Sequence, residues 1–261
     1  MSSHGIQDIS VIRLLVCYLL FLISFLLISY YRLRLEKDAI ISTLRMTAQL
    51  FLAGLVLKYI FKFNIWYIVL IILLIMVFFG VHTVIERTGI KLRKLFPSLF
   101  LSMLAGCGGT LFFFIALIVQ QSPWYDARYL IPLFGMIVGN SMNGCALALE
   151  RFYNGIKDNQ NAVESLLSLG GTPIEASRPY FLNAFKASVL PTFASMTGMG
   201  IVFLPGMMTG QILSGAEPLL AVKYQIAIML AILSSAVFSG FLILKLTTKL
   251  IFTSRSQLID M

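Results

Sequence analysis

The chain has 261 residues, of which 59% are hydrophobic and 12% are charged. A soluble domain carries about 25% charged residues, so half of the usual polar surface is missing. The composition therefore excludes an ordinary soluble domain and indicates a protein that lipid surrounds. The net charge of +9 needs no nucleic acid, because basic residues beside membrane spans and contact with anionic lipid account for it.

Apolar segments long enough to cross a bilayer recur along the chain. A crossing takes about 20 helical residues, and runs this long and uniform are helices rather than the short alternating strands of a barrel. We therefore expect an all-α polytopic membrane protein. Its expected spans, about seven, are Val11–Tyr31, Ile40–Leu57, Ile65–Ile85, Leu99–Val119, Tyr129–Leu149, Ala184 to about Leu213, and Leu219–Leu246.

The distribution of basic residues predicts the orientation of these spans. Lys and Arg concentrate after the first, third and fifth spans and in the C-terminal tail, and cytoplasmic segments are enriched in both. We therefore expect the N-terminus outside and the C-terminus in the cytoplasm of a plasma-membrane protein, or an inner-membrane protein in a bacterium. No long linker divides the chain, so residues 1–261 are expected to form one transmembrane domain, with a cytoplasmic loop at about 151–185.

Enzyme and nucleotide-binding motifs are absent from the sequence. No lysine stands in G-K-[ST], so the chain has no Walker A loop. If ATP drives a transport process here, another polypeptide supplies the energy. Cys17, Cys107 and Cys145 lie in apolar spans without paired spacing and indicate neither a disulfide framework nor a zinc motif. We expect no cofactor bound by this chain.

The loop between the fifth and sixth spans contains a short amphipathic helix. Val163, Leu166 and Leu167 lie at helical spacing within Ala162–Leu169. Three residues then stop the helix: Gly170, Gly171 and Pro173. The apolar face must pack against something, which is a partner protein, the bilayer surface or the protein's own helix bundle.

The segment from Glu164 to Pro173, ESLLSLGGTP, resembles the EAA loop of ABC-transporter permeases. In that loop a short coupling helix fits into a groove on the ATPase subunit. Glu164 matches the acidic position and Gly170 the glycine, whereas Ser165 and Leu166 replace alanines. The ATPase-coupling residues that this resemblance implies are Glu164, Ser165, Leu166, Leu167, Gly170, Gly171, Pro173 and Arg178.

A second resemblance covers three longer segments of the second half of the chain. MNGCALALER at Met142–Arg151, GGTPIEASRP at Gly170–Pro179 and LPGMMTGQILSGAEPLLAVKYQIAIM at Leu204–Met229 closely resemble the FetB-like family of ABC permeases. That family includes bacterial iron exporters and plant half-transporters linked to aluminium tolerance. Cys145 replaces a typical Thr, and Ala194 replaces Asn or Asp, which puts a solute-binding role for that position in doubt.

The resemblance implies a permease subunit of an ATP-driven exporter of iron or a related metal ion. It implies a separate cytoplasmic ABC ATPase subunit that holds ATP and Mg, and two copies of this chain in a two-plus-two complex. Two alternatives stay open: an ABC permease for another small solute such as a nucleotide sugar, and a non-transporting membrane scaffold.

Helix breakers interrupt the sixth expected span in FLPGMMTGQILSG. Pro205 should kink or break the helix. Gly206 and Gly210 allow another helix to approach closely, and Thr209 and Gln211 can hydrogen bond across such a contact. Because freed backbone groups inside a bilayer must face protein or a water-lined cavity, the segment either is part of a substrate path or forms a tight subunit contact, and the simpler alternative is a packing kink near the outer membrane face.

Polar side chains and methionines supply the other candidates for a substrate path. Asn140 and Asn143 share one face of the fifth span with Glu150, where interhelical hydrogen bonds or solute binding explains them. Met207 and Met208 offer soft thioether sulfurs, and Glu150 offers a carboxylate. These three residues are the candidate metal ligands. The substrate-path candidates are Asn140, Asn143, Glu150, Met199, Pro205, Gly206, Met207, Met208, Thr209 and Gln211.

Overall fold

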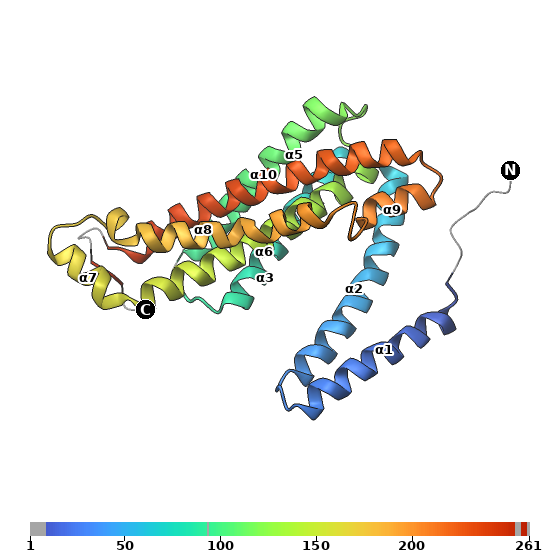
Figure 1. Cartoon of the computed structure of the whole chain (residues 1–261). Helices are drawn as coiled ribbons and strands as arrows, with labels where there is room; N and C mark the ends of the chain where they lie inside the picture. The colour runs from blue at the N-terminus through green and yellow to red at the C-terminus, as the bar shows by residue number, and fades with distance from the viewer. Residues whose placement is uncertain (1–8, 93, 254–256, 260–261) are drawn as a thin grey trace. The chain divides into compact units, whose positions relative to one another are not determined.

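A computed structural model describes residues 9–92, 94–253 and 257–259 of the chain (Figure 1). These residues form helices joined by short loops, so the all-α prediction is confirmed. The helices in chain order are α1 (Val11–Tyr30), α2 (Glu36–Phe63), α3 (Trp66–Thr88), α4 (Leu95–Met103), the π-helical η1 (Leu104–Gly108), α5 (Gly109–Phe113), the π-helical η2 (Phe114–Val119), α6 (Ala127–Asp158), α7 (Gln160–Ser168), α8 (Pro173–Gly198), α9 (Gly206–Leu213) and α10 (Pro218–Ile251).

Six helical segments of the described chain are long and apolar enough to cross a membrane. They are α1, α2, α3, the continuous Leu95–Val119 segment, α6 and α10. The sixth expected span differs, because α8 begins in the preceding loop and ends at Gly198, and α9 begins only at Gly206. The interruption before Pro205 is thus observed, but α8 already ends at Gly198, seven residues before the proline.

The chain divides into two compact units, which are described separately. The smaller unit comprises the residues up to Phe63 together with Gly210–Ala216. In it α1 packs against α2, and the Tyr18 hydroxyl shares a hydrogen bond of 2.6 Å with the Thr47 hydroxyl. The side chains of both helices are largely exposed, as expected for helices that face lipid.

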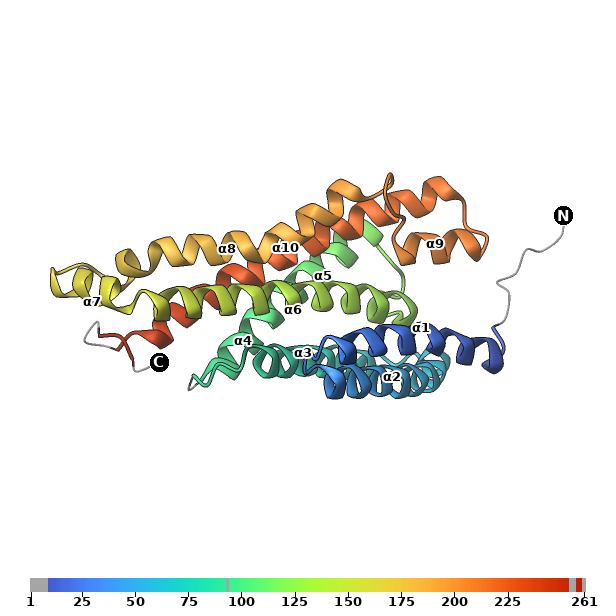
Figure 2. The same cartoon turned by 60° about the horizontal axis from the view of Figure 1, so that its bottom comes forward.

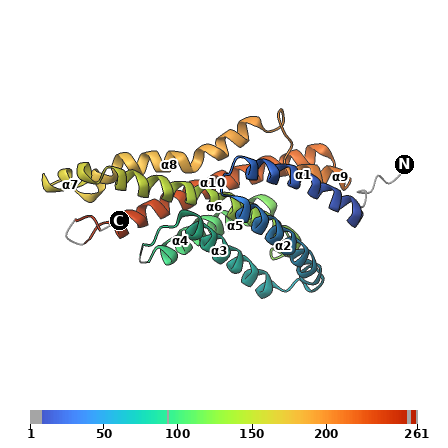
Figure 3. The same cartoon turned by 90° about the horizontal axis from the view of Figure 1, so that it is seen from below.

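The larger unit, Asn64–Thr209 and Glu217–Met261, is built on α6, α8 and α10. These three long helices lie side by side (Figure 1; Figure 2). α6 and α10 both run toward α7, and α8 runs back from it. The helix α3 packs along α6, and α4 and η1 pack against α10 (Figure 3).

Small residues allow the helices of this unit to approach closely. A Cβ on Gly106 would lie 2.9 Å from the backbone nitrogen of Ser239, and a Cβ on Gly240 would lie 2.9 Å from the Ser188 hydroxyl oxygen. A Cβ on Gly144 would lie 3.0 Å from the Ser188 carbonyl oxygen. Close backbone approach of this kind is the usual basis of helix association in lipid.

A buried chain of polar side chains joins three of the helices. Ser141 of α6 and Ser235 of α10 share a hydrogen bond of 2.7 Å, and Ser235 lies within hydrogen-bond distance, 3.3 Å, of the Cys107 sulfur in η1. All three residues are fully buried. Their hydroxyl and thiol groups find partners inside the unit, which a polar group away from water requires.

α6 and α10 are longer than the hydrocarbon layer of a bilayer is thick. α6 has 32 residues and α10 has 34, which correspond to about 48 and 51 Å, against about 30 Å of hydrocarbon. Their last turns meet α7 and the first half of α8 in a separate apolar cluster, called here the end cluster. Its buried members are Ala148, Phe152, Ile156, Val163, Ala176, Ala184, Leu244, Ile251 and Phe252.

Candidate functional site

The short helix α7 is attached to the bundle through one narrow apolar stripe. Val163 is only 2% exposed and packs in the end cluster with Phe152 and Ile156 of α6 and Ile251 of α10. Leu167, one turn later, is half-buried against the same cluster. The expected helix at Ala162–Leu169 is therefore present with slightly different bounds, and it packs on its own bundle.

The opposite face of α7 presents both apolar and polar side chains to the surroundings. Leu166 is 40% exposed, so the buried stripe is narrower than the sequence indicates. Leu169 is 85% exposed and Ile174, at the start of α8, is 73% exposed. Glu164 and Ser165 are exposed beside them, and the Glu164 carboxylate accepts a hydrogen bond of 2.9 Å from Gln160.

A tight glycine turn ends α7. The Gly170 N–H donates to the Leu167 carbonyl and the Gly171 N–H donates to the Leu166 carbonyl, each at 3.0 Å. This pair of bonds is a Schellman motif, which requires a left-handed residue, and Gly170 has φ of +89°. A Cβ on Gly171 would lie 2.8 Å from the Leu166 carbonyl oxygen, so this position also excludes side chains.

A capping box starts α8 immediately after that turn. The Thr172 hydroxyl accepts a hydrogen bond from the Glu175 N–H at 3.3 Å, and the Glu175 carboxylate accepts from the Thr172 N–H and hydroxyl, each at 2.8 Å. The hydrogen bond from the Thr172 backbone N–H lowers the pKa of Glu175 most, and the hydrogen bond from the Thr172 hydroxyl lowers it further. Pro173 occupies the first helical turn, where its missing N–H costs nothing, and Arg178 is exposed one turn further.

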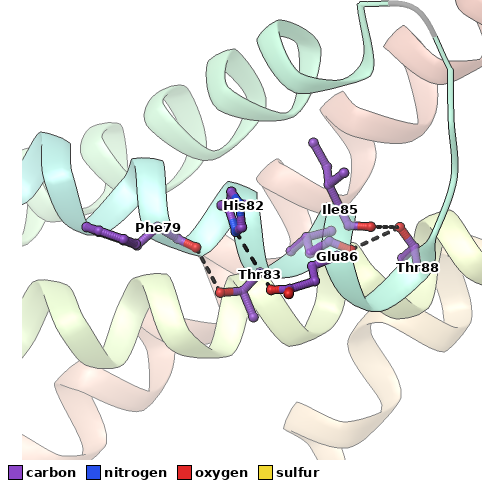
Figure 4. A network of polar contacts seen from close by, with 7 residues as sticks. Phe79, His82, Thr83, Ile85, Glu86 and Thr88 are labelled. Carbon is purple, nitrogen blue, oxygen red and sulfur yellow. Dashed lines mark hydrogen bonds and ion pairs between the residues drawn. The ribbon is translucent and has the colours of Figure 1, made fainter. Parts of the chain in front are cut away.

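The end of α3 carries a group of polar side chains (Figure 4). His82 Nδ1 lies 3.8 Å from a Glu86 carboxylate oxygen, one helical turn away. The Thr83 and Thr88 hydroxyls donate to carbonyls of their own helix. His82 and Glu86 remain more than half exposed.

Asn143 is joined to this end of α3 by a hydrogen bond to its side chain. Arg87 donates a hydrogen bond of 3.2 Å to the Asn143 amide oxygen. Asn140 uses its amide nitrogen to bond the Met136 carbonyl of its own helix at 2.8 Å. Glu150 is exposed seven residues beyond Asn143, which places it about 10 Å further along the extended part of α6. The structure therefore separates Glu150 from the two methionine candidates.

The interruption between α8 and α9 is a compact turn. Met199 leaves the helix with ψ of 136°, Gly200 has φ of +83°, and the Gly200 N–H donates to the Phe203 carbonyl at 2.9 Å. Pro205 then precedes α9, and its carbonyl accepts from the Thr209 N–H at 3.0 Å.

The G-x-x-x-G motif of α9 has no close neighbour within the described chain. A Cβ on Gly206 or Gly210 would meet no described atom within 4 Å. The Thr209 hydroxyl donates to carbonyls of its own helix, at 3.0 Å to Gly206, rather than across a helix contact. Gln211 is half-buried in the same short helix. The predicted close contact of Gly206 and Gly210 with another helix stays a prediction.

A pocket lies in the larger unit between the end of α8, the start of α9 and the first turns of α10. Its volume is about 290 Å³. Two of the predicted residues, Met199 and Met208, line it, whereas Met207 does not. Its other lining residues are Met196, Gly200, Leu204, Val222, Gln225, Ile226, Met229 and Leu230.

Three polar or sulfur-bearing residues of this pocket were not predicted from the sequence: Met196, Gln225 and Met229. The available signal was Gln225, the one amide side chain in the first half of the last expected span. Among the described residues, no group of three or more His, Cys, Asp or Glu side chains is arranged to hold a metal ion. Any metal chemistry at this pocket would therefore depend on thioether and amide groups.

The sequence matches the family described as Uncharacterised protein family (UPF0014) over residues 11–252. It is similar to the probable iron export permease protein FetB of Escherichia coli, with 34% identity over 259 residues, 99% of this chain and 97% of that protein. It is 37% identical over 215 residues to a UPF0014 membrane protein of Synechocystis, covering 82% and 83%. Protein ALUMINUM SENSITIVE 3 of Arabidopsis thaliana is 34% identical over 226 residues, covering 87% and 81%. No solved structure matches the chain.

Proposed function

Because the chain belongs to the UPF0014 family of multi-pass membrane proteins, we propose that it is the permease subunit of an ATP-driven exporter of metal ions. The name of the E. coli relative, a probable iron export permease, supports the class of cargo and the direction. The family carries no enzymatic description. The chain also has no Walker A sequence, so a separate ABC ATPase subunit would hold ATP and Mg.

The packing of the larger unit supports the orientation of this permease. α6 and α10 both run into the end cluster, so α8 must carry the chain back across the membrane between them. This return adds one crossing to the six apolar spans, and the two ends of the chain then lie on opposite sides. The extended end of the bundle carries Arg151, Lys157, Arg178 and Lys249, which favours the cytoplasm for that end and the outside for the N-terminus.

The surface around α7 is the observation that carries the proposal. A stripe of buried side chains fixes α7 to the bundle, while Leu169 and Ile174 project exposed apolar groups beside Glu164. Large apolar side chains exposed in water mark a surface that binds a partner. The Schellman turn and the capping box connect α7 rigidly to α8, so a push on α7 would reach the broken end of α8.

The ATPase would sit on this surface, and paired ATPases would require two copies of the permease. The arrangement is a two-plus-two complex in lipid, without nucleic acid. A different solute, such as a nucleotide sugar, fits the same machinery with a different pocket. A non-transporting scaffold would have no ATPase partner.

Affinity purification from native membranes in mild detergent, with mass spectrometry, tests the proposal. We expect a soluble ATPase with Walker motifs in amounts equal to the permease. Leu169→Ser together with Glu164→Ala should release it. The control Leu219→Ser changes a similarly exposed leucine, 68% exposed at the far end of α10, and should retain the ATPase. Absence of any ATPase while other membrane complexes survive would favour the scaffold.

A further inference from the structure

The pocket at the end of the bundle opposite α7 concentrates methionine. Four of the twelve methionines of the chain line it: Met196 and Met199 of α8 and its cap, Met208 of α9, and Met229 of α10. Met196 and Met199 are three residues apart and share a helix face, as do Gln225 and Met229, four residues apart on α10. Three separate elements therefore bring thioether groups to one space of about 290 Å³.

Gln225 places an unsatisfied polar group in this pocket. Its side chain is 5% exposed, and its Oε1 has no hydrogen-bond partner among the described residues. Its Nε2 lies 3.9 Å from the Met199 sulfur. A buried amide oxygen without a partner is costly, and buried polar groups in native structures normally have one. Gln225 thus brings to the lining of the pocket an amide oxygen that no described residue uses as a hydrogen-bond acceptor.

The remaining lining of the pocket bears no charge. It consists of glycine and aliphatic residues, with no acidic or basic side chain. The cost of desolvating an ion rises with the square of its charge, so a divalent cation would lose about four times as much hydration free energy here as a monovalent one. Neutral donors do not offset that loss, and thioether sulfur is a soft ligand that selects Cu(I) over hard cations.

We propose that this pocket is a binding site for a soft monovalent cation of the Cu(I) class, held by the thioethers of Met199, Met208 and their neighbours with the Gln225 amide oxygen. Methionine has three rotatable bonds beyond Cα, so the sulfurs can close on an ion that the open pocket admits. The inference deepens the proposed export function, because it names the class of cargo at the outer end of the permease.

Its position beside the break in α8 suits a release site. The pocket is formed by the residues on both sides of the Met199 to Pro205 turn, so a shift of α8 would separate Met196 and Met199 from Met208. Separation of the ligands would lower the affinity for the ion. Movement of α7 and release at the pocket would then be linked through one helix.

Binding of Ag(I), an analogue of Cu(I) that resists oxidation, tests the site on the purified full-length chain. The exposed thiol is first removed by Cys17→Ala, since thiols also bind silver. We expect about one Ag(I) per chain with sulfur ligands in the X-ray absorption spectrum. Met199→Leu with Met208→Leu, which conserves volume, should weaken binding at least roughly tenfold.

The matched control is Met136→Leu with Met142→Leu, two half-buried methionines of α6 outside the pocket. This control should bind like the parent chain. Equal affinity in the pocket variant and the control would overturn the proposal, as would a pocket occupied by detergent or lipid in a chain that binds no Ag(I). Gln225→Leu should weaken binding without changing the number of sulfur ligands.

ATPase stimulation in the complex with the partner separates this inference from the proposed function. Ag(I) that binds the pocket but stimulates no ATPase activity would leave the site standing and contradict the export proposal. Stimulation by Fe(II) that is unchanged in the pocket variant would support the exporter and overturn the soft-cation cargo.

Discussion

Val163→Ala should weaken the attachment of α7 to the bundle without unfolding the rest of the protein. Val163 is 2% exposed in the end cluster, where the last turns of α6 and α10 meet α7. The substitution removes two methyl groups, worth about 1.6 kcal/mol at 0.8 kcal/mol per group, and leaves a small cavity, for a total of about 2 to 3 kcal/mol. Only Leu167 then holds the stripe, so the opening equilibrium of α7 should rise by roughly 30-fold or more.

Hydrogen exchange with mass spectrometry measures this opening directly. Amides of α7 should exchange faster in Val163→Ala by roughly that factor, while α10 amides in the bundle centre keep their rates. The control Leu169→Ala removes an exposed leucine, so it should leave α7 protected and weaken only ATPase binding. Unchanged exchange in Val163→Ala would show that the stripe does not hold α7, and equal exchange in both variants would refute the division between an anchored and a docking face.

Three further changes test the packing, the turn and the cap. Gly106→Ala places a methyl group 2.9 Å from the α10 backbone and should destabilise the larger unit by about 1 to 3 kcal/mol. A thermal-shift assay measures the loss, and the control Gly108→Ala, whose methyl group meets no atom within 4 Å, should melt like the parent chain. Gly170→Ala forces φ of +89° on a residue with a side chain and should cost about 1 to 2 kcal/mol, with Gly170→Asn costing less; equal loss would contradict the left-handed turn. The pKa of Glu175 is lowered in the folded protein. Its capping interaction therefore stabilises α8 at pH values above the ordinary carboxyl pKa, and this stabilisation is lost as the pH falls through the lowered pKa. Hydrogen-exchange protection of the first α8 amides should fall in acid, and a similar fall in Glu175→Gln would exclude the carboxylate as the cause.

The helical fold could be predicted from the sequence because lipid imposes a strong constraint. Uninterrupted apolar runs must satisfy their backbone internally, so length and hydropathy identify the spans. The sixth span is the exception, since α8 draws its first eleven residues from the loop. Its hydropathy is lowered by polar residues, among them the exposed Asn183 and Lys186, and composition does not show which faces are covered.

The stop signals of α7 were also readable, because Gly170 and Gly171 act locally. The orientation of Leu166 was not, since helical spacing alone does not fix how wide the buried stripe is.

The methionine pocket was only half visible in the sequence. Met199 and Met208 lie near the helix breakers and stood out, whereas Gln225 and Met229 lie about 20 residues further on in a different helix. Only the antiparallel return of α10 beside α8 brings them together. Contacts of this kind depend on tertiary packing, which no local pattern encodes.

Transport in inside-out membrane vesicles tests the central claim most directly, because the cytoplasmic face with the ATPase is then accessible. Vesicles that contain the chain and its ATPase should accumulate radioactive Ag(I) or Fe(II) when ATP is added, and vesicles with Leu169→Ser and Glu164→Ala should not. If the ATPase is bound and active but ATP drives the accumulation of neither cation, export of metal ions by this permease is contradicted.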